Sequence, residues 1–91
     1  MLPALTRHAQ ARMQQRAIRT DALELLFEYG REAFDHRGGV VLYFDKAARR
    51  RLQHAAPRAS GLERIVRCYA VVSTGGKVIT VGHRSARIIR V

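Results

Sequence analysis

His-Ala-Gln-Ala-Arg-Met-Gln-Gln-Arg-Ala-Ile, residues 8–18, is the segment from which the architecture of this 91-residue chain is best predicted. Its residue types are good helix formers, and neither Gly nor Pro interrupts them, which predicts a helix from about residue 5 to residue 17. On that helix His8, Arg12 and Arg16 recur every four residues and lie along one face. An apolar stripe runs roughly 100° around the axis from this ladder: Leu5, Ala9 and Met13. A solvated basic face is an equally good interpretation of the ladder.

The residues that follow predict a second helix, several strands and an inserted basic helix. Thr20 and Gly30 delimit the second helix, whose apolar face begins at Ala22. Asp45 caps a basic helix over 46–54, and Ser60 opens a capping box that predicts one more helical turn. The strands are expected at 32–36, 40–44, 67–73, 78–83 and 86–91, with hairpin turns at the glycine pairs 38–39 and 75–76.

This order of elements predicts a single α+β domain over residues 1–91. An N-terminal helical hairpin packs on a mainly antiparallel sheet of about four to five strands, with the basic helix inserted between the strands. Alternation along 40–44 places Val40, Leu42 and Phe44 on one face of the sheet, and it places Val41 and Tyr43 on the other.

The net charge of +10 is concentrated in the second half of the chain. Residues 1–45 carry six basic and six acidic side chains, whereas residues 46–91 carry eleven basic side chains and Glu63 alone. Arginine supplies fifteen of the seventeen cations, and its planar guanidinium suits phosphate groups. The asymmetry predicts an anionic partner and favours nucleic acid over membrane.

Several classes of protein are disfavoured by what the sequence lacks. No apolar run approaches the roughly 18 residues of a membrane-spanning helix, and the apolar N-terminal segment is too short for a signal peptide, so we expect a cytoplasmic protein with no membrane partner. Cys68 is the only cysteine, which excludes an internal disulfide and predicts an inert, buried thiol. The four histidines lack the spacing of metal ligands, so neither a metal nor a cofactor is expected.

The helix pattern H-A-x-x-R-M-x-x-R-x-I resembles a family of small bacterial domains of unknown function that is grouped with the RelE-like toxins. Residues 38–44, 78–84 and 87–88 resemble the strands of the same family. The resemblance implies a single RelE-like domain in the wider set of barnase, colicin-type and RelE-type ribonuclease folds. It also implies an active surface on the sheet, where basic residues converge, with Tyr69 and Thr80 as further contacts.

Cleavage of RNA through the ribose 2′-hydroxyl needs a base, an acid and cations around the phosphate, which histidine and arginine can supply. We therefore favour a metal-independent endoribonuclease of the toxin type, acting on RNA that is either free or bound to ribosomes. The candidate catalytic residues come from the first helix and the last strands: His8, Arg12, Arg16, His83 and Arg87. The residues expected to bind nucleic acid are Arg49, Arg50, Arg51, Arg67, Tyr69, Thr80, Arg84 and Arg90.

Two alternatives from other classes remain open. A non-catalytic RNA- or DNA-binding module explains the charge equally well, although Tyr69 is almost the only aromatic side chain among the basic strands. A basic interaction protein, covered by an acidic antitoxin or immunity protein, explains it too. Arg12 and Arg16 also have a purely structural interpretation, in which they are buried against the acidic second helix.

Overall fold

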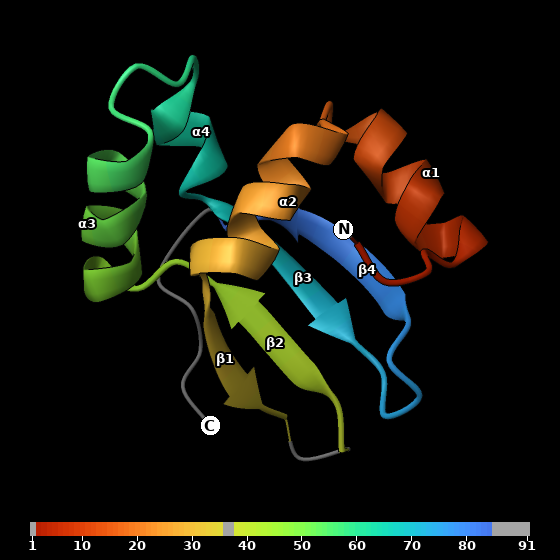
Figure 1. The fold of residues 1–91 in the computed structure, drawn as a ribbon. Coiled ribbons are helices and arrows are strands. Elements are labelled where there is room, and N and C mark those ends of the chain that lie inside the picture. Colours follow the sequence, from red (N-terminus) through yellow and green to blue (C-terminus); the bar gives the residue numbers. More distant parts are fainter. Residues whose placement is uncertain (1, 36–37, 85–91) are drawn as a thin grey trace.

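The computed structural model describes residues 2–35 and 38–84, and within them the chain forms four helices and four strands (Figure 1). Their order along the chain is α1 (Arg7–Gln15), α2 (Thr20–Tyr29), β1 (Arg31–Phe34), β2 (Val40–Tyr43), α3 (Lys46–Ala55), α4 (Leu62–Ile65), β3 (Cys68–Val72) and β4 (Val78–His83). The expected α+β class is confirmed. The strand expected at 86–91 lies outside the described residues.

The four strands form one antiparallel sheet in the order β1-β2-β3-β4, so each strand pairs with its neighbour along the chain. The hairpins expected at the two glycine pairs join β1 to β2 and β3 to β4. The N-terminal segment extends this sheet at its far edge, because Leu5 forms an isolated parallel bridge with Val78. That pairing explains why α1 begins at Arg7, two residues later than the sequence predicts.

Both ends of α1 are fixed by local hydrogen bonds. The Thr6 hydroxyl accepts a hydrogen bond from the Ala9 amide and caps the first turn. At the other end, Ala17 has a left-handed backbone with φ of 53°, and the Ile18 amide donates to the Met13 carbonyl at 2.8 Å. This is the arrangement of a Schellman motif, which usually places glycine at the left-handed position. The helix therefore stops at Gln15, and Ile18 turns into the core.

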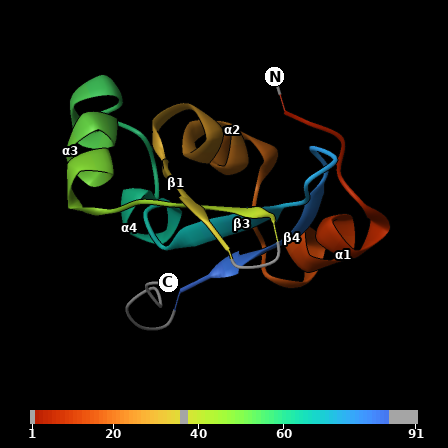
Figure 2. The ribbon, with the colours of Figure 1, turned by 90° about the horizontal axis from the view of Figure 1, so that it is seen from below.

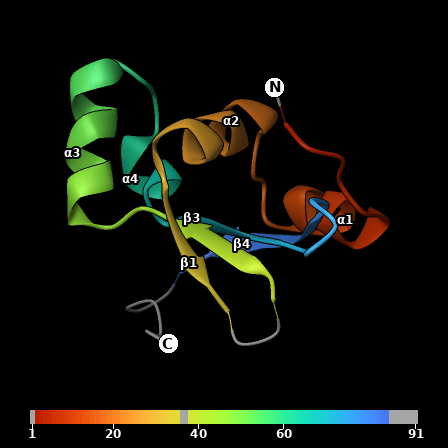
Figure 3. The same cartoon turned by 60° about the horizontal axis from the view of Figure 1, so that its bottom comes forward.

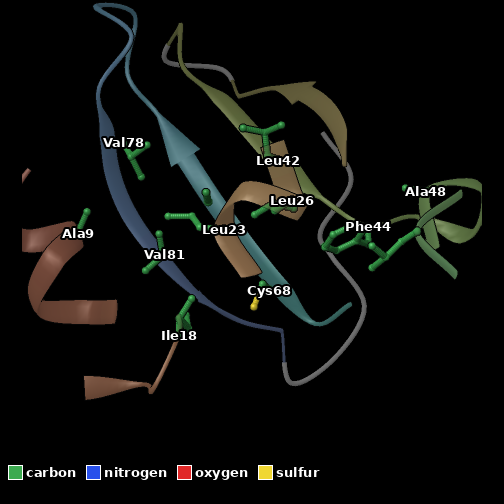
Figure 4. Packing of buried hydrophobic residues seen from close by; sticks show 12 residues of the cluster. Ala9, Ile18, Leu23, Leu26, Leu42, Phe44, Ala48, Cys68, Val78 and Val81 are labelled. Atoms are coloured by element: carbon green, nitrogen blue, oxygen red, sulfur yellow. The ribbon is translucent and has the colours of Figure 1, made fainter. Parts of the chain in front are cut away.

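The two N-terminal helices pack against different parts of the sheet. α1 lies along the edge of β4, whereas α2 covers β2 and β3 and also contacts α3 (Figures 1 and 2). Leu23 and Leu26 of α2 are fully buried against the sheet. Figure 4 shows these side chains among the buried residues of the strands, which include Leu42 and Val81.

A β-bulge in β4 sets which side chains enter the core. Val71 pairs with Thr80 and Val72 pairs with Val78, so Ile79 has no residue opposite it. The extra residue lets Val78 and Val81 both face the core, although their spacing in a regular strand would place them on opposite faces. It also places Thr80 on the face of the sheet away from α2.

The caps of the last two helices differ in how well the sequence predicts them. Asp45 caps α3 as expected, because its carboxylate accepts a hydrogen bond from the Ala48 amide at 2.8 Å. The capping box expected from Ser60 is wrong. Gly61 takes the N-cap position of α4 with a left-handed backbone, and no side chain caps that helix.

Candidate nucleic-acid interface

The face of the sheet opposite α2 is the candidate site, and we call it the open face. Figure 3 shows α2 above the sheet and α1 beside its edge, so that no described helix covers the opposite face. Pairing between the strands defines the residues that share this face in two rows. The first row consists of Arg31, Tyr43, Tyr69 and Gly82, and the second consists of Ala33, Val41, Val71 and Thr80.

Two tyrosines lie side by side at the centre of the open face. Tyr43 and Tyr69 are direct partners of the β2–β3 pair, and both side chains are half-buried. Tyr69 also lies over the backbone of Gly82, where an added Cβ would be 2.9 Å from the ring. Gly82 therefore permits the close approach that holds the Tyr69 ring against the sheet. The pair provides two aromatic rings of the kind on which unpaired bases stack.

Arg84 follows β4 directly and is fixed beside these tyrosines. Its Nη2 atom donates to the Phe44 carbonyl at 3.1 Å, and its guanidinium carbon lies 5.8 Å from the centroid of the Tyr43 ring. Its backbone N–H donates to the Arg67 carbonyl at 2.7 Å. These contacts hold the guanidinium in one place without neutralising its charge.

The charge of Arg84 has no carboxylate counterion among residues 2–35 and 38–84. Its Nε atom is buried and has no hydrogen-bond partner among those residues. Burial, followed by the nearby positive charge of Arg49, lowers the pKa of Arg84 from its ordinary value. A partly desolvated guanidinium without a counterion is a suitable group for an anion such as a phosphate.

The cations around the open face outnumber its acids. Arg31 lies in the same row as the tyrosines, and Arg49 lies close enough to Arg84 to act on its charge. Arg31 pairs with Asp45 at 3.2 Å, which neutralises one cation and leaves the others available. The exposed carboxylates of α2 lie on the opposite side of the sheet: Asp21, Glu24 and Glu28. The exposed surface of α2 is therefore acidic and lies away from the open face.

The structure brings together part of the set of residues that the sequence predicts to bind nucleic acid. Tyr69 and Thr80 lie on the open face with Arg84 beside them, whereas the charge of Arg67 acts on His83, which faces the α2 side. The three arginines of α3 lie in different surroundings. Arg49 lies near Arg84, and Arg50 is exposed. The Arg51 guanidinium donates a hydrogen bond to the Tyr29 carbonyl at 3.0 Å. Arg90 lies outside the described residues.

The predicted catalytic residues do not meet in one place. His8 and Arg12 contact each other on α1, where the Arg12 Nε atom donates to the His8 Nε2 atom at 3.3 Å. They lie near the start of β4, because the Thr6 hydroxyl donates to the Ile79 carbonyl. His83 ends β4, so a strand rise of about 3.3 Å per residue separates the two positions by about 13 Å. No hydrogen bond joins them within the described part of the chain, and Arg87 lies outside it.

His83 and Arg16 form a second, separate grouping. The side chain of His83 faces the α2 side of the sheet, as its pairing with Cys68 requires. Burial is the main reason that its pKa lies below the ordinary value of 6.5, and the charges of Arg64, Arg16 and Arg67 act in the same direction. Both effects favour the neutral form of the His83 imidazole.

The interpretation in which Arg12 and Arg16 are buried against the acidic second helix is not supported by the ion pairs. The ion pairs formed among the described residues are Arg19 with Asp21 at 3.5 Å and Arg31 with Asp45 at 3.2 Å. Neither Arg12 nor Arg16 takes part in them. α2 instead uses its apolar side chains, rather than its carboxylates, to bind the rest of the domain.

The remaining chemical expectations concern the thiol, metals and membranes. Burial raises the pKa of the Cys68 thiol to about 11, so Cys68 is protonated and unreactive at neutral pH. Over the described ranges, no three side chains of His, Cys, Asp or Glu converge where they could hold a metal ion. No helix in this part of the chain is long and apolar enough to cross a membrane.

Neither a protein-family model, nor a curated protein, nor a solved structure matches this chain.

Proposed function

We propose that this protein binds single-stranded RNA across the open face of its sheet. The observation that carries the proposal is the Arg84 guanidinium, which is anchored beside Tyr43 and Tyr69 and has no carboxylate partner within residues 2–35 and 38–84. Two neighbouring bases stack on the tyrosines, and the phosphate that links them contacts Arg84. Aromatic rings on a sheet surrounded by arginines are a common solution for single-stranded RNA.

The distribution of charge supports the same orientation of the ligand. The open face carries Arg84 with Arg49 near it, whereas Glu24 and Glu28 of α2 are exposed on the opposite side. This difference in charge between the open face and α2 favours the approach of a polyanion to the open face. RNA on the open face also leaves the hydrophobic contacts of α2 undisturbed.

The test is the affinity for a short, unstructured, fluorescently labelled RNA, measured by anisotropy at several salt concentrations. Arg84→Gln and Tyr69→Leu should each weaken binding by about tenfold, through loss of a charge-assisted hydrogen bond and of a stacking surface. Arg50→Gln is the matched control, because Arg50 is exposed on α3 and its replacement by Gln makes the same change of charge. Equal affinities for all three variants would exclude the open face as the binding site.

The salt dependence of binding provides a second check. Binding of a polyanion releases counterions, so the logarithm of the affinity should fall linearly with the logarithm of the salt concentration. For single strands the slope is about −0.7 for each phosphate that is neutralised. Arg84→Gln removes about one phosphate contact, so the slope should become shallower by about 0.7. An affinity that does not change with salt would refute RNA binding by charge.

The second candidate function is metal-independent RNA cleavage by a RelE-like toxin on the same face. The anchored guanidinium beside the phenol groups favours it, because the resemblance in the sequence implies an active surface on the sheet. In this reaction the 2′-oxygen forms a bond to phosphorus, the bond from phosphorus to O5′ breaks, and the proton of the 2′-hydroxyl is finally carried by O5′. Arg84 would stabilise the charge that develops on the phosphate.

Cleavage and binding are separated by the products and by growth. A nuclease leaves 2′,3′-cyclic phosphate ends in the presence of a metal chelator, with or without ribosomes, and slows growth when it is induced in a bacterial cytoplasm. Arg84→Gln should abolish both effects, whereas Arg50→Gln should retain them. If the wild-type protein, freed of any acidic antitoxin, neither cuts RNA nor slows growth, the cleavage function is excluded.

A further inference from the structure

A pocket of about 480 Å³ lies on the α2 side of the sheet, at the end of β4 that carries His83. Its wall comes from the segment between α1 and α2, from α2 itself, and from the neighbourhood of α4 (Figure 1). The volume lies within the range of pockets that take small organic ligands. The pocket is separate from the open face, because consecutive residues of a strand point to opposite sides of the sheet.

One part of the pocket is apolar and the other part is positively charged. Ile18, Ala22 and Leu25 provide the apolar wall, while Arg64 and His83 lie on the charged side. Arg64 is exposed, and within residues 2–35 and 38–84 its guanidinium makes a single long hydrogen bond, at 3.5 Å, to the Arg16 carbonyl, so it is available to a ligand. The pocket therefore matches a molecule that has an apolar part at one end and an anionic group at the other.

The positive charge of the pocket exceeds the negative charge. Arg16 and Arg67 lie close enough to His83 to act on its charge, together with Arg64. Asp21, the carboxylate of the pocket wall, is paired with Arg19 at 3.5 Å and also accepts the Ala22 amide. The His83 imidazole has an N–H group that can donate a hydrogen bond to an anion while the arginines supply the charge.

We infer that this pocket binds a nucleoside monophosphate unit, with its phosphate at Arg64 and His83 and its nucleoside part against Ile18 and Leu25. The ligand is either a free mononucleotide or the terminal nucleotide of an RNA that lies on the open face. Only the second source rests on the proposed function. It is geometrically reasonable because His83 and Arg84 are adjacent, with His83 in the pocket and Arg84 on the open face.

The probe is adenosine 5′-monophosphate, titrated into the full chain by calorimetry beside adenosine and inorganic phosphate. The nucleotide should bind more tightly than either fragment, because it alone fills both parts of the pocket. Arg64→Gln should weaken the nucleotide by about tenfold. Arg58→Gln is the matched control, since Arg58 is exposed and does not line the pocket.

Three outcomes would overturn the inference. The first is a nucleotide that binds no better than inorganic phosphate, the second is no binding at millimolar concentration, and the third is an equal loss in Arg64→Gln and Arg58→Gln. Circular dichroism of each variant shows that a loss of binding is not a loss of folding. The Arg64 side chain is exposed and is not part of the buried cluster, so its replacement should leave the fold intact.

A second set of measurements separates the two sources and the two proposals. If the pocket holds an RNA terminus, an oligonucleotide with a terminal phosphate binds more tightly than one without, and Arg64→Gln removes the difference. If it holds a free mononucleotide, both oligonucleotides bind alike. Arg84→Gln should leave the affinity for adenosine 5′-monophosphate unchanged. If RNA does not bind but the mononucleotide binds through Arg64, the proposed function is refuted and mononucleotide binding in the pocket is supported.

Discussion

The two faces of the sheet are built from alternate residues of the same strands, yet they have opposite properties. On the face beneath α2, Leu42, Ala70 and Val81 form a paired row and are almost fully buried. On the open face, the adjacent row holds Tyr43 and Tyr69, which are half-buried and lie beside arginines. Stability and ligand binding therefore depend on neighbouring residues. Substitutions one position apart should affect one property and spare the other.

The largest expected effect comes from placing an acid on each face in turn. Val81→Asp buries a carboxylate among apolar side chains and should cost more than about 3 kcal/mol, which is enough to unfold much of a small domain. Thr80→Asp puts the same acid on the open face, where it should leave the protein folded and weaken RNA binding by repulsion. Thermal denaturation of both variants measures the contrast. Similar melting temperatures would show that the two faces are not distinct.

A smaller effect is expected from Gly82, the position at which backbone and aromatic ring meet on the open face. Gly82→Ala places a Cβ 2.9 Å from the Tyr69 ring, so either the ring or the strand must move, at a cost of about 1–2 kcal/mol. RNA affinity should fall because Tyr69 no longer lies flat on the sheet. Chemical denaturation and anisotropy measure the two effects.

Gly75→Ala is the control for that substitution, because a Cβ there would meet only the Ser73 Oγ atom, at 3.8 Å. It should change neither stability nor affinity appreciably. A Gly82→Ala variant that behaves like Gly75→Ala would contradict the close contact between Tyr69 and the sheet.

Asp45 has two roles: it caps α3, and it pairs with Arg31 of the open face. Asp45→Ala should destabilise the domain by about 1 kcal/mol through loss of the N-cap, whereas Asp45→Asn should retain most of the cap. The hydrogen bond from the Ala48 amide is the main reason that the pKa of Asp45 lies below its ordinary value of 3.8, with Arg31 acting in the same direction.

The sign of the pH effect follows from that lowered pKa. The carboxylate stabilises the folded state fully above about pH 4, and this contribution is lost as the pH falls below 3.8 toward the lower pKa of the folded state. Urea denaturation at pH 7 and at pH 3 should therefore show a larger acid-induced loss in the wild type than in Asp45→Asn. The same loss in both proteins would mean that other carboxylates dominate.

The smallest expected effect is a gain in stability on the covered side of the domain. Ala17 has a left-handed backbone, which costs an L-residue about 1–2 kcal/mol, while glycine adopts it freely but loses more entropy on folding. Ala17→Gly should therefore stabilise the protein by about 0.5 kcal/mol. Ala11→Gly, in the exposed middle of α1, should instead destabilise it by about 1 kcal/mol. Opposite signs in urea denaturation would support the Schellman geometry, and equal signs would refute it.

Much of the architecture could be predicted from local patterns. Gly30 ends α2, Asp45 caps α3, and the glycine pairs join the hairpins, because each of these features depends on residues a few positions apart. The start of α1 was predicted wrongly because a distant segment intervened, since pairing of Leu5 with Val78 shortens the helix. The capping box at Ser60 failed for a local reason, because Gly61 takes the N-cap position.

The candidate site could be predicted only in part. Alternation along β2 already placed Tyr43 away from the core, and Tyr69 was predicted to contact RNA. The sequence did not predict that these two residues are neighbours, because they are 26 positions apart and meet only through the register of β2 and β3. The helix ladder of His8, Arg12 and Arg16 is correctly periodic. Its distance from His83 depends on how α1 lies along β4, which no local pattern specifies.

The sequence by itself determined the α+β class, most helix and hairpin boundaries, and the excess of arginine in the second half of the chain, since propensity, turn chemistry and composition act locally. Only the tertiary structure decided which arginines share a surface. Arg84 contacts the Phe44 carbonyl, lies over Tyr43 and receives Arg49 as a neighbour, across 35 or more positions of sequence in each case. The register of the sheet fixes those contacts, and one residue of slippage would move every side chain to the other face.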